Sequence, residues 1–429
     1  MDDVSTRMGP GPEFCGLPRE LQLLVLSYLS HGELVLVARV SKALRRLAYD
    51  PCLWKTVNVA HDDMDDRWLQ GALDHLSQLE ALTLSWSPLV PAWAAHAARF
   101  PKLRLLNVRW SLNVNAAVLS LFVDGCPLLS HLDVEGCDGV DDAAVEALCP
   151  LAGLLSVNMS SCYQVTDDGL LALARSCPRL VSLNADGISN ITDRGVCGLA
   201  EHLGPQLVCL KLNGEQLTDK SFGALRCCSR LETLFVSFAE KITDAGLASI
   251  KELRTLRRLK LDADLQLTAR GLGSLFQGGS MGHLISLELE GLELDDQALA
   301  LLVKGCPRLQ VLALPIRRDI TEAGLATIVN NCPNLESLFL PGPYEVQRLC
   351  LAGLAVSMPK LRYLRLQLSE MVDDPPLESL TRRLPHLRVY NSSGQLLVPY
   401  EPSSALSLDM EASKDKEGSG AHDRLLLLC

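Results

Sequence analysis

The chain has 429 residues, of which 48% are hydrophobic and 21% charged, and its formal net charge at pH 7 is −11. This acidic balance argues against a nucleic-acid-binding protein, because such proteins present basic surfaces to phosphate groups. Length alone would predict two or three domains, but a chain built from repeats can extend one core without starting another.

Residues 1–13 are polar, and we predict a flexible lead without the basic start and apolar core of a signal peptide. No apolar run in the chain approaches the ~20 residues that span a membrane. The fifteen cysteines contain no Cys-x-x-Cys pair, and the nine histidines show no metal-ligand spacing. We therefore expect reduced thiols, no bound metal, no membrane partner, and a cytoplasmic or nuclear location, or both.

Residues 14–56 carry three short apolar patterns with helical spacing. The first pattern places Leu21, Leu24, Val25 and Leu29 on one face of a helix, and two further stripes follow before the chain reaches Pro51. About 40 residues are few for an independent core. We therefore expect this small helical domain to dock on the residues that follow it, or on a partner.

This segment resembles an F-box. The resemblance lies in an opening Leu-Pro, a closing Leu-Trp and positions between them: Leu17, Pro18, Leu21, Leu29, Leu34, Val40, Ser41, Lys42, Arg45, Leu47, Ala48, Leu53 and Trp54. Leu44 departs from the pattern, because many F-boxes carry Trp there. In that family the F-box binds the Skp adaptor of a cullin-based ubiquitin ligase. The resemblance implies adaptor contacts at six residues: Leu17, Pro18, Leu21, Leu24, Val37 and Val40.

The alternative for residues 14–56 is a helical cap on the end of the repeats that follow. Stacked repeats need such caps, because a terminal repeat would otherwise expose its apolar side. A plain cap would bind no adaptor, so adaptor binding distinguishes the two interpretations.

Residues 57–390 are predicted to form one solenoid of repeats. A Leu-x-x-Leu-x-Leu pattern, with some Val, Met or Ala substitutions, starts twelve times between Leu79 and Leu361, at intervals of 24 to 28 residues. Trp54, Val57 and Val59 look like a degenerate leading copy, and a weaker copy follows at the end. Regular periods of this length are typical of solenoids.

Each copy carries the signals of one strand and one helix. Thr-Asp pairs such as Thr192-Asp193 precede apolar runs, where the Thr can cap a helix and the carboxylate favours the positive end of its dipole. Cys-Pro pairs mark helix ends, because Pro cannot continue a helix. We expect the thiols of these pairs to be buried and unreactive, and Cys429 to react. The five cysteines are Cys126, Cys149, Cys177, Cys306 and Cys332.

These copies resemble the cysteine-containing leucine-rich repeat. Cys137 and Cys162 stand where that family places its signature Cys, although other copies have Gly, Asp or Glu nearby. The resemblance implies an α/β solenoid shaped as a horseshoe, with parallel strands on the concave face and helices outside. One strand and one helix cannot bury their apolar faces alone, so neighbouring copies share the core.

Side chains between the buried strand positions are predicted to face the concave surface, where a protein substrate could bind. Aromatic residues there have no core to fill, and aromatics with Arg are enriched at binding hot spots. The predicted substrate-binding residues are Lys211, Phe235, Arg258, Lys260, Phe339 and Tyr363. The basic ones could hold an acidic or phosphorylated segment. The alternative is that carboxylates on adjacent strands pair with them: Asp262, Glu288 and Glu290.

We predict no catalytic residue and no cofactor. The glycine-rich run at residues 278–282 lacks the Lys-Ser or Lys-Thr that a phosphate-binding loop needs. Asp pairs such as Asp141-Asp142 recur at one place in the repeat, as helix capping requires and catalysis does not. Residues 391–429 have the composition of a largely disordered tail.

In combination, the two resemblances point to F-box leucine-rich-repeat proteins. They imply a non-catalytic substrate-recognition subunit of a Skp-cullin-F-box ubiquitin ligase, whose repeats hold the protein to be ubiquitinated. A plain scaffold without a ligase link, or a regulator that clamps its target in the repeats, remains open. An extracellular repeat receptor would need a signal peptide and capping disulfides, and neither is predicted.

Overall fold

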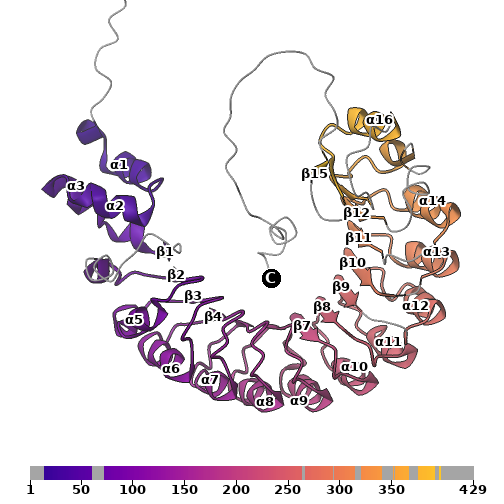
Figure 1. Cartoon of the computed structure of the whole chain (residues 1–429), viewed down its shortest axis with the longest axis horizontal. Helices are drawn as coiled ribbons and strands as arrows, with labels where there is room; N and C mark the ends of the chain where they lie inside the picture. Colours follow the sequence, from indigo (N-terminus) through magenta and orange to yellow (C-terminus); the bar gives the residue numbers. More distant parts are fainter. Residues whose placement is uncertain are drawn as a thin grey trace, which may run out of the picture. The chain divides into compact units, whose positions relative to one another are not determined.

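The computed structural model of the chain describes residues 14–59, 72–262, 266–292, 294–314, 320–340, 351, 353–366, 375–391 and 396–397. The chain divides into two compact units. Unit one contains the residues up to 165 and residues 175–179, and unit two contains residues 166–174 and those from 180 onward. In the repeats of each unit, strands lie along one side and helices along the other (Figure 1). We call the side of the sheet without helices the open face.

Unit one begins with short helices and continues with parallel strands. Its helical elements are η1 (Phe14–Gly16), α1 (Arg19–Leu26), α2 (His31–Ala38), α3 (Lys42–Ala48), η2 (Pro51–Trp54), η3 (Leu73–His75), α5 (Val90–Ala94), η4 (Ala97–Arg99), α6 (Ala116–Gly125) and α7 (Asp142–Glu146). Its strands are β1 (Thr56–Asn58), β2 (Ala81–Thr83), β3 (Leu105–Asn107), β4 (His131–Asp133) and β5 (Ser156–Asn158). These strands pair in parallel in chain order.

Unit two repeats one strand and one helix. Its helices are α8 (Asp167–Ser176, up to residue 174), α9 (Asp193–Leu203), α10 (Asp219–Leu225), α11 (Asp244–Ile250), α12 (Ala269–Phe276), α13 (Asp296–Gly305), α14 (Glu322–Asn331) and α16 (Pro375–Arg383). Its strands are β6 (Ser182–Ala185), β7 (Cys209–Asn213), β8 (Thr233–Ser237), β9 (Arg258–Asp262), β10 (Ser286–Glu290), β11 (Val311–Ala313), β12 (Ser337–Phe339), β13 (Tyr363–Arg365), β14 (Arg388–Tyr390) and β15 (Leu396–Leu397).

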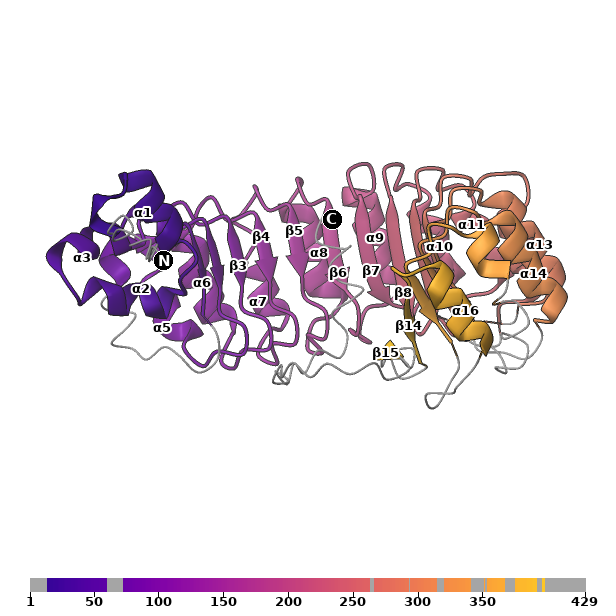
Figure 2. The same ribbon diagram turned by 90° about the horizontal axis from the view of Figure 1, so that it is seen from above.

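Strands β6 to β14 also pair in parallel in chain order, and β15 runs antiparallel to β14 (Figure 2). In each unit, the leucines of the repeat pattern form the core between the strands and the helices. In unit one, Leu79, Leu82 and Leu84 of the first full copy are completely buried. Each such side chain contributes roughly 1.5–3 kcal/mol to folding. The leucine-rich-repeat fold predicted from the sequence is confirmed, and Trp54, Val57 and Val59 of the degenerate leading copy are all buried, with Val57 on β1.

The Thr-Asp pairs of unit two link neighbouring repeats. Thr192 caps α9 by accepting a hydrogen bond from the backbone N–H of Arg194 at 3.2 Å. The carboxylate of Asp167, one repeat earlier, accepts hydrogen bonds from the N–H and hydroxyl of Thr192 at 2.8 and 2.7 Å. The same two bonds join Asp193 to Thr218, Asp219 to Thr243, Asp244 to Thr268 and Asp296 to Thr321. We call this series the Asp–Thr ladder.

A glycine makes room for every carboxylate of the ladder except that of Asp193. A Cβ atom at Gly195 would lie 2.3 Å from Oδ1 of Asp167, and one at Gly246 would lie 2.5 Å from Oδ1 of Asp219. The helix that starts after Thr218 has Ser221 at this position, and its hydroxyl donates to Asp193. The ladder therefore explains why Thr-Asp-x-Gly recurs at residues 166–169, 192–195 and 243–246.

Unit one joins its repeats at the turn after each strand. The hydroxyl of Ser111 donates to the carbonyl of Leu84 at 2.8 Å. In the next two repeats the thiol of Cys137 donates to Val108 at 3.2 Å, and the thiol of Cys162 donates to Val134 at the same distance. The cysteines that match the family signature are therefore hydrogen-bonded to the repeat before them.

Four of the five Cys-Pro thiols are buried: Cys126, Cys177, Cys306 and Cys332. Burial raises the pKa of Cys126 and Cys306 to about 12. The prediction is wrong for Cys149, which is partly exposed. Helix α7 ends at Glu146, and the turn that follows carries Cys149 away from the helix end.

Asp193→Asn should destabilise unit two by about 1–3 kcal/mol, because an amide nitrogen cannot accept the hydrogen that Thr218 donates. Burial opposes ionisation of Asp193, but hydrogen bonds from Ser221 and Thr218 outweigh it and lower its pKa. The carboxylate's contribution is therefore complete above the unfolded pKa of about 3.9 and disappears as the pH falls through the lower folded value. Urea unfolding at pH 7 and pH 3 measures this. Glu201→Gln, at an exposed position on α9, is the control and should change nothing.

Maleimide labelling of the native protein should modify Cys52 and Cys227 first, because both are exposed, and Cys149 more slowly. The four buried Cys-Pro thiols should react only after unfolding, since a buried thiol is rarely the reactive thiolate. Mass spectrometry of time points identifies the labelled peptides. Early modification of Cys126 or Cys306 would contradict the helix ends described here. Cys429 lies outside the described residues.

Candidate interaction surfaces

Residues 14–58 contain three short α-helices, of which α2 and α3 begin at side-chain caps and α1 does not. Ser30 and Glu33 form a capping box at the start of α2, in which the N–H of Glu33 donates to Ser30 and the N–H of Ser30 donates to Glu33. Ser41 caps α3 by accepting from the N–H of Leu44 at 3.1 Å. Asp50 accepts from the N–H of Cys52 and starts η2. These caps satisfy helix N–H groups that would otherwise lack partners.

Trp54 joins this helical segment to the first repeats. Its side chain is completely buried, and its indole N–H donates to the carbonyl of Ala48 at 2.7 Å. The ring centroid lies 5.1 Å from that of His31 and 5.7 Å from that of Tyr49. Tyr49 in turn stacks on His75 of η3 at 3.9 Å. The segment therefore docks on the repeats through an aromatic cluster.

Helix α1 presents an apolar surface to solvent. Leu21, Leu24 and Val25 recur with a spacing of three and four residues on one side of the helix, and Tyr28 continues this spacing in the turn that follows α1. Tyr28 is 83% exposed, and the other three are about half exposed. We call these four residues the α1 stripe. Solvated apolar side chains in such a group are typical of a protein-binding surface.

The six residues predicted to contact an adaptor differ in exposure. Pro18, Leu21, Leu24 and Val40 are exposed, whereas Leu17 and Val37 are partly buried. The sequence analysis missed three exposed apolar residues: Val25, Tyr28 and Leu36. The helical spacing of Val25 and Tyr28 with Leu21 was visible in the sequence. Spacing alone cannot show which side of a short helical segment faces solvent.

The six residues predicted to bind substrate form two groups on the open face of unit two. Lys211, Phe235 and Lys260 are aligned across β7, β8 and β9, and the amine of Lys211 lies 5.1 Å from the ring centroid of Phe235. Arg258 lies on β9, two positions before Lys260. Phe339 and Tyr363 lie on β12 and β13, three strands further on.

Acidic neighbours pair with the first group. The amine of Lys260 lies 3.2 Å from a carboxylate oxygen of Glu290. Partial burial favours the neutral amine, but the carboxylates of Glu290 and Glu288 outweigh this and raise the pKa of Lys260. The structure therefore favours the alternative stated for this patch, in which carboxylates on the adjacent strand neutralise the lysine.

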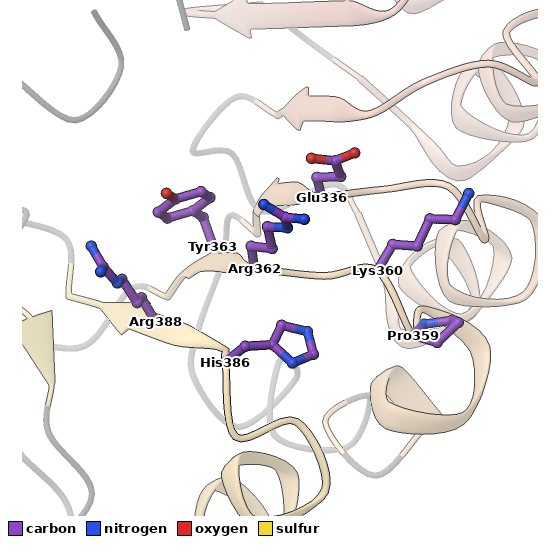
Figure 3. Close-up of a pocket in the computed structure, with 7 residues that line it drawn as sticks. All are labelled: Glu336, Pro359, Lys360, Arg362, Tyr363, His386 and Arg388. Carbon is purple, nitrogen blue, oxygen red and sulfur yellow. The ribbon is translucent and has the colours of Figure 1, made fainter. Parts of the chain in front are cut away.

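A pocket of about 640 Å³ lies beside the second group, in the last repeats of unit two. Its lining residues are Glu336, Pro359, Lys360, Arg362, Tyr363, His386 and Arg388 (Figure 3). Three cationic side chains and one carboxylate give the lining a net charge of two positive, without counting His386. We call this site the basic pocket. It brings Tyr363 together with cations that the sequence analysis did not select.

Consecutive repeats contribute the same pattern to the basic pocket. Pro359-Lys360-Leu361-Arg362 is followed 26 residues later by Pro385-His386-Leu387-Arg388. Parallel pairing of β13 with β14 then places the two runs side by side, and the N–H of Arg388 donates to the carbonyl of Arg362 at 2.8 Å. A search for like charges at matching positions of adjacent repeats would have found this site.

The helical segment and the repeats each have known counterparts. The F-box-like family matches residues 14–60. The chain carries an F-box-like domain followed by leucine-rich repeats. The resemblance stated from the sequence is confirmed for both parts.

Two curated proteins and one solved structure illustrate the similarity. The antagonist of mitotic exit network protein 1 of Eremothecium gossypii is 28% identical over 70% of this chain and 72% of its own length. Lysine-specific demethylase 2B of Mus musculus is 27% identical over 53% of this chain, and this match spans only 19% of the demethylase. A chain in the crystal structure of the yeast Rad7 and Elc1 complex has a TM-score of 0.58 and 21% identity, with coverage of 76% of this chain and 89% of its own. This last likeness shows the fold alone.

Two searches of the described residues found no membrane or metal site. No helix among them has the length and hydrophobicity to cross a bilayer. In the same part of the chain, no group of three or more His, Cys, Asp or Glu side chains is placed to hold a metal ion. The candidate interaction sites are therefore the α1 stripe, the group around Phe235 and the group around Tyr363.

The aromatic cluster at Trp54 should weaken in acid. Burial lowers the pKa of His31 below its usual value, although the backbone of Leu53 and Thr56 favours the charged ring. Stability from this site is therefore complete above the unfolded His pKa of about 6.5 and falls as the pH drops toward the folded value. Hydrogen exchange of residues 14–58 should speed up between about pH 7 and pH 5, beyond the intrinsic effect of pH. His31→Phe should remove most of this dependence, and an equal dependence in that variant would contradict it.

Proposed function

We propose that this chain is the substrate-recognition subunit of a Skp-cullin-F-box ubiquitin ligase. In this role the F-box-like domain binds the Skp adaptor, and through it a cullin, while the open face of unit two binds the protein to be ubiquitinated. The chain itself transfers no ubiquitin and needs no cofactor. We further propose that it acts where its thiols stay reduced, in the cytoplasm, the nucleus or both.

The observation that carries this proposal is the α1 stripe within a segment that matches the F-box-like family. A plain cap would turn its apolar side chains toward the repeat that it covers. Here the segment joins the repeats through Tyr49, which stacks on His75, and through β1, which pairs with β2. The exposed apolar side chains of the α1 stripe are left for another protein. Their area is small, so the adaptor must also contact polar residues around them.

The fold of the repeats supports the second half of the proposal. Rad7, whose complex with Elc1 was crystallised, has a similar fold over most of its chain. A long parallel sheet with an uncovered face offers many side chains to one partner without a deep cleft. That geometry suits recognition of a folded or extended protein better than chemistry on a small molecule.

One observation favours a non-catalytic scaffold whose helical segment is only a cap. β1 pairs with β2, and Tyr49 stacks on His75, so the segment continues the stack of unit one. A scaffold would leave the α1 stripe without an adaptor. The two functions therefore differ in one measurable property, which is affinity for the adaptor.

Calorimetry with purified full-length chain should detect binding of a purified Skp adaptor. Leu21→Ala with Leu24→Ala should weaken it at least about thirtyfold, because loss of central interface anchors costs about 2 kcal/mol or more. The matched control is Leu121→Ala with Leu128→Ala, at repeat positions of similar exposure: Leu21 46%, Leu24 53%, Leu121 45% and Leu128 48%.

If the α1 variant, with Leu21→Ala and Leu24→Ala, bound Skp with unchanged affinity, the α1 stripe would not be part of the interface. Absence of Skp binding by the unmodified chain would favour the scaffold. Elc1 serves as a second probe. If the chain bound Elc1 instead of Skp, the proposal of adaptor binding would stand, but the ligase would not be of the Skp-cullin-F-box class. Affinity purification from cells with the proteasome blocked then recovers substrates, which should be retained by the α1 variant.

A further inference from the structure

The geometry points to the basic pocket as the binding site for an anionic protein segment, either phosphorylated or rich in Asp and Glu. This inference names a substrate class for the open face and depends on the proposed function only for the role of that substrate. The site itself rests on the positions of Lys360, Arg362 and Arg388 around one space.

The described cations of the basic pocket outnumber the carboxylates there, and Arg362 extends toward Glu336 (Figure 3). Glu336 is the only carboxylate among the seven lining residues. Within the part of the chain that the structure describes, no ion pair joins Arg362 or Arg388 to a carboxylate, and the amine of Lys360 donates to the neutral amide oxygen of Asn334 at 2.8 Å. By contrast, Lys260 on β9 is paired with Glu290. The described lining of the basic pocket therefore carries a net positive charge, whereas the charge of Lys260 is compensated.

The cations surround Tyr363 on neighbouring strands. Arg362 directly precedes β13, and Arg388 begins β14 opposite Tyr363 in the parallel register (Figure 3). Guanidinium groups bind phosphate and carboxylate oxygens with paired hydrogen bonds. A phosphate ester carries a charge of about −1.5 to −2 at neutral pH, which matches a lining with two net positive charges.

The surroundings favour a protein segment over a free anion or a nucleic acid. The ring of Tyr363 lines the pocket, and Phe339 lies on the next strand with the guanidinium of Arg365 5.2 Å from its ring centroid. These rings offer apolar contact to the residues beside an anionic side chain. The chain as a whole has a net charge of −11, which repels a long polyanion while a few local cations can still hold one short segment.

The test uses purified full-length chain and fluorescent short peptides of Ala and Gly. One peptide carries a central phosphoserine, the second carries three successive Glu residues, and the third carries Ser at the centre. We expect saturable binding of the phosphoserine or the Glu peptide, or of both, and none of the Ser peptide. Binding should weaken as salt rises from about 50 to 300 mM, because screening lengths shorten over that range.

Arg362→Ala with Arg388→Ala should reduce this affinity at least about tenfold, since each removes charge-assisted hydrogen bonds. The control is Arg257→Ala, which occupies the same position in its repeat as Arg362 but pairs with Glu232 at 3.4 Å and lies outside the pocket. It should bind as the unmodified chain does. All three replaced side chains are exposed, so the variants should fold, and thermal melting verifies this.

Either anionic peptide alone supports the site and identifies which source of negative charge it prefers. Equal binding by the double variant, or no binding of either anionic peptide, would overturn the inference. Tighter binding of a single-stranded oligonucleotide than of the phosphoserine peptide would overturn the assignment to a protein segment. No adaptor takes part in these measurements, so a chain that binds the peptides but no adaptor would retain this site and lose the ligase role.

Discussion

The stacking of unit two depends on how each repeat satisfies the polar groups at the start of its helix. The first N–H groups of a helix have no partner within it, and burying them unpaired is costly. Thr218 shows the solution, because Asp193 of the repeat before accepts both its N–H and its hydroxyl. The carboxylate also lies near the positive helix end. This requirement ties the Thr, the Asp and the small residue after them to one spacing, and the spacing aligns the strands.

Alignment of the strands decides what the open face can bind. In parallel pairing, residues one repeat apart become neighbours about 4.8 Å from strand to strand. Arg362 and Arg388 contribute to one site for this reason, although 26 residues separate them. Lys260 and Glu290 neutralise each other for the same reason. The F-box-like segment works differently, since its α1 stripe comes from one helix and depends on the caps and on Trp54 to be held in place.

Periodicity was enough to predict the fold, because the leucine positions allow few other ways to bury so many side chains. The sites were harder to predict. A strand residue such as Lys260 was correctly placed on the open face, but its sequence could not show whether Glu290 or a partner would compensate its charge. Cys149 was placed at a helix end by its proline, yet α7 stops one turn earlier. The exposure of Tyr28, which follows α1, was not predicted. Apolar residues occur on more than one side of this short helix, so the sequence does not show which side faces solvent.

One repeat lacks the carboxylate that would hold the next. Ala269 stands at the first position of α12, where α8, α9, α10, α11 and α13 begin with Asp, and the N-cap of α13 is Asp295 instead of Thr. No rung of the Asp–Thr ladder therefore joins α12 to α13. The sheet continues across this junction, because β9 and β10 pair in parallel over five residues from Arg258 to Asp262. Neighbouring repeats are therefore coupled here by strand pairing and by packing of apolar side chains rather than by a buried carboxylate. The basic pocket lies beyond this junction, so the sheet and this packing keep it in line with the strands that carry Lys211 and Phe235.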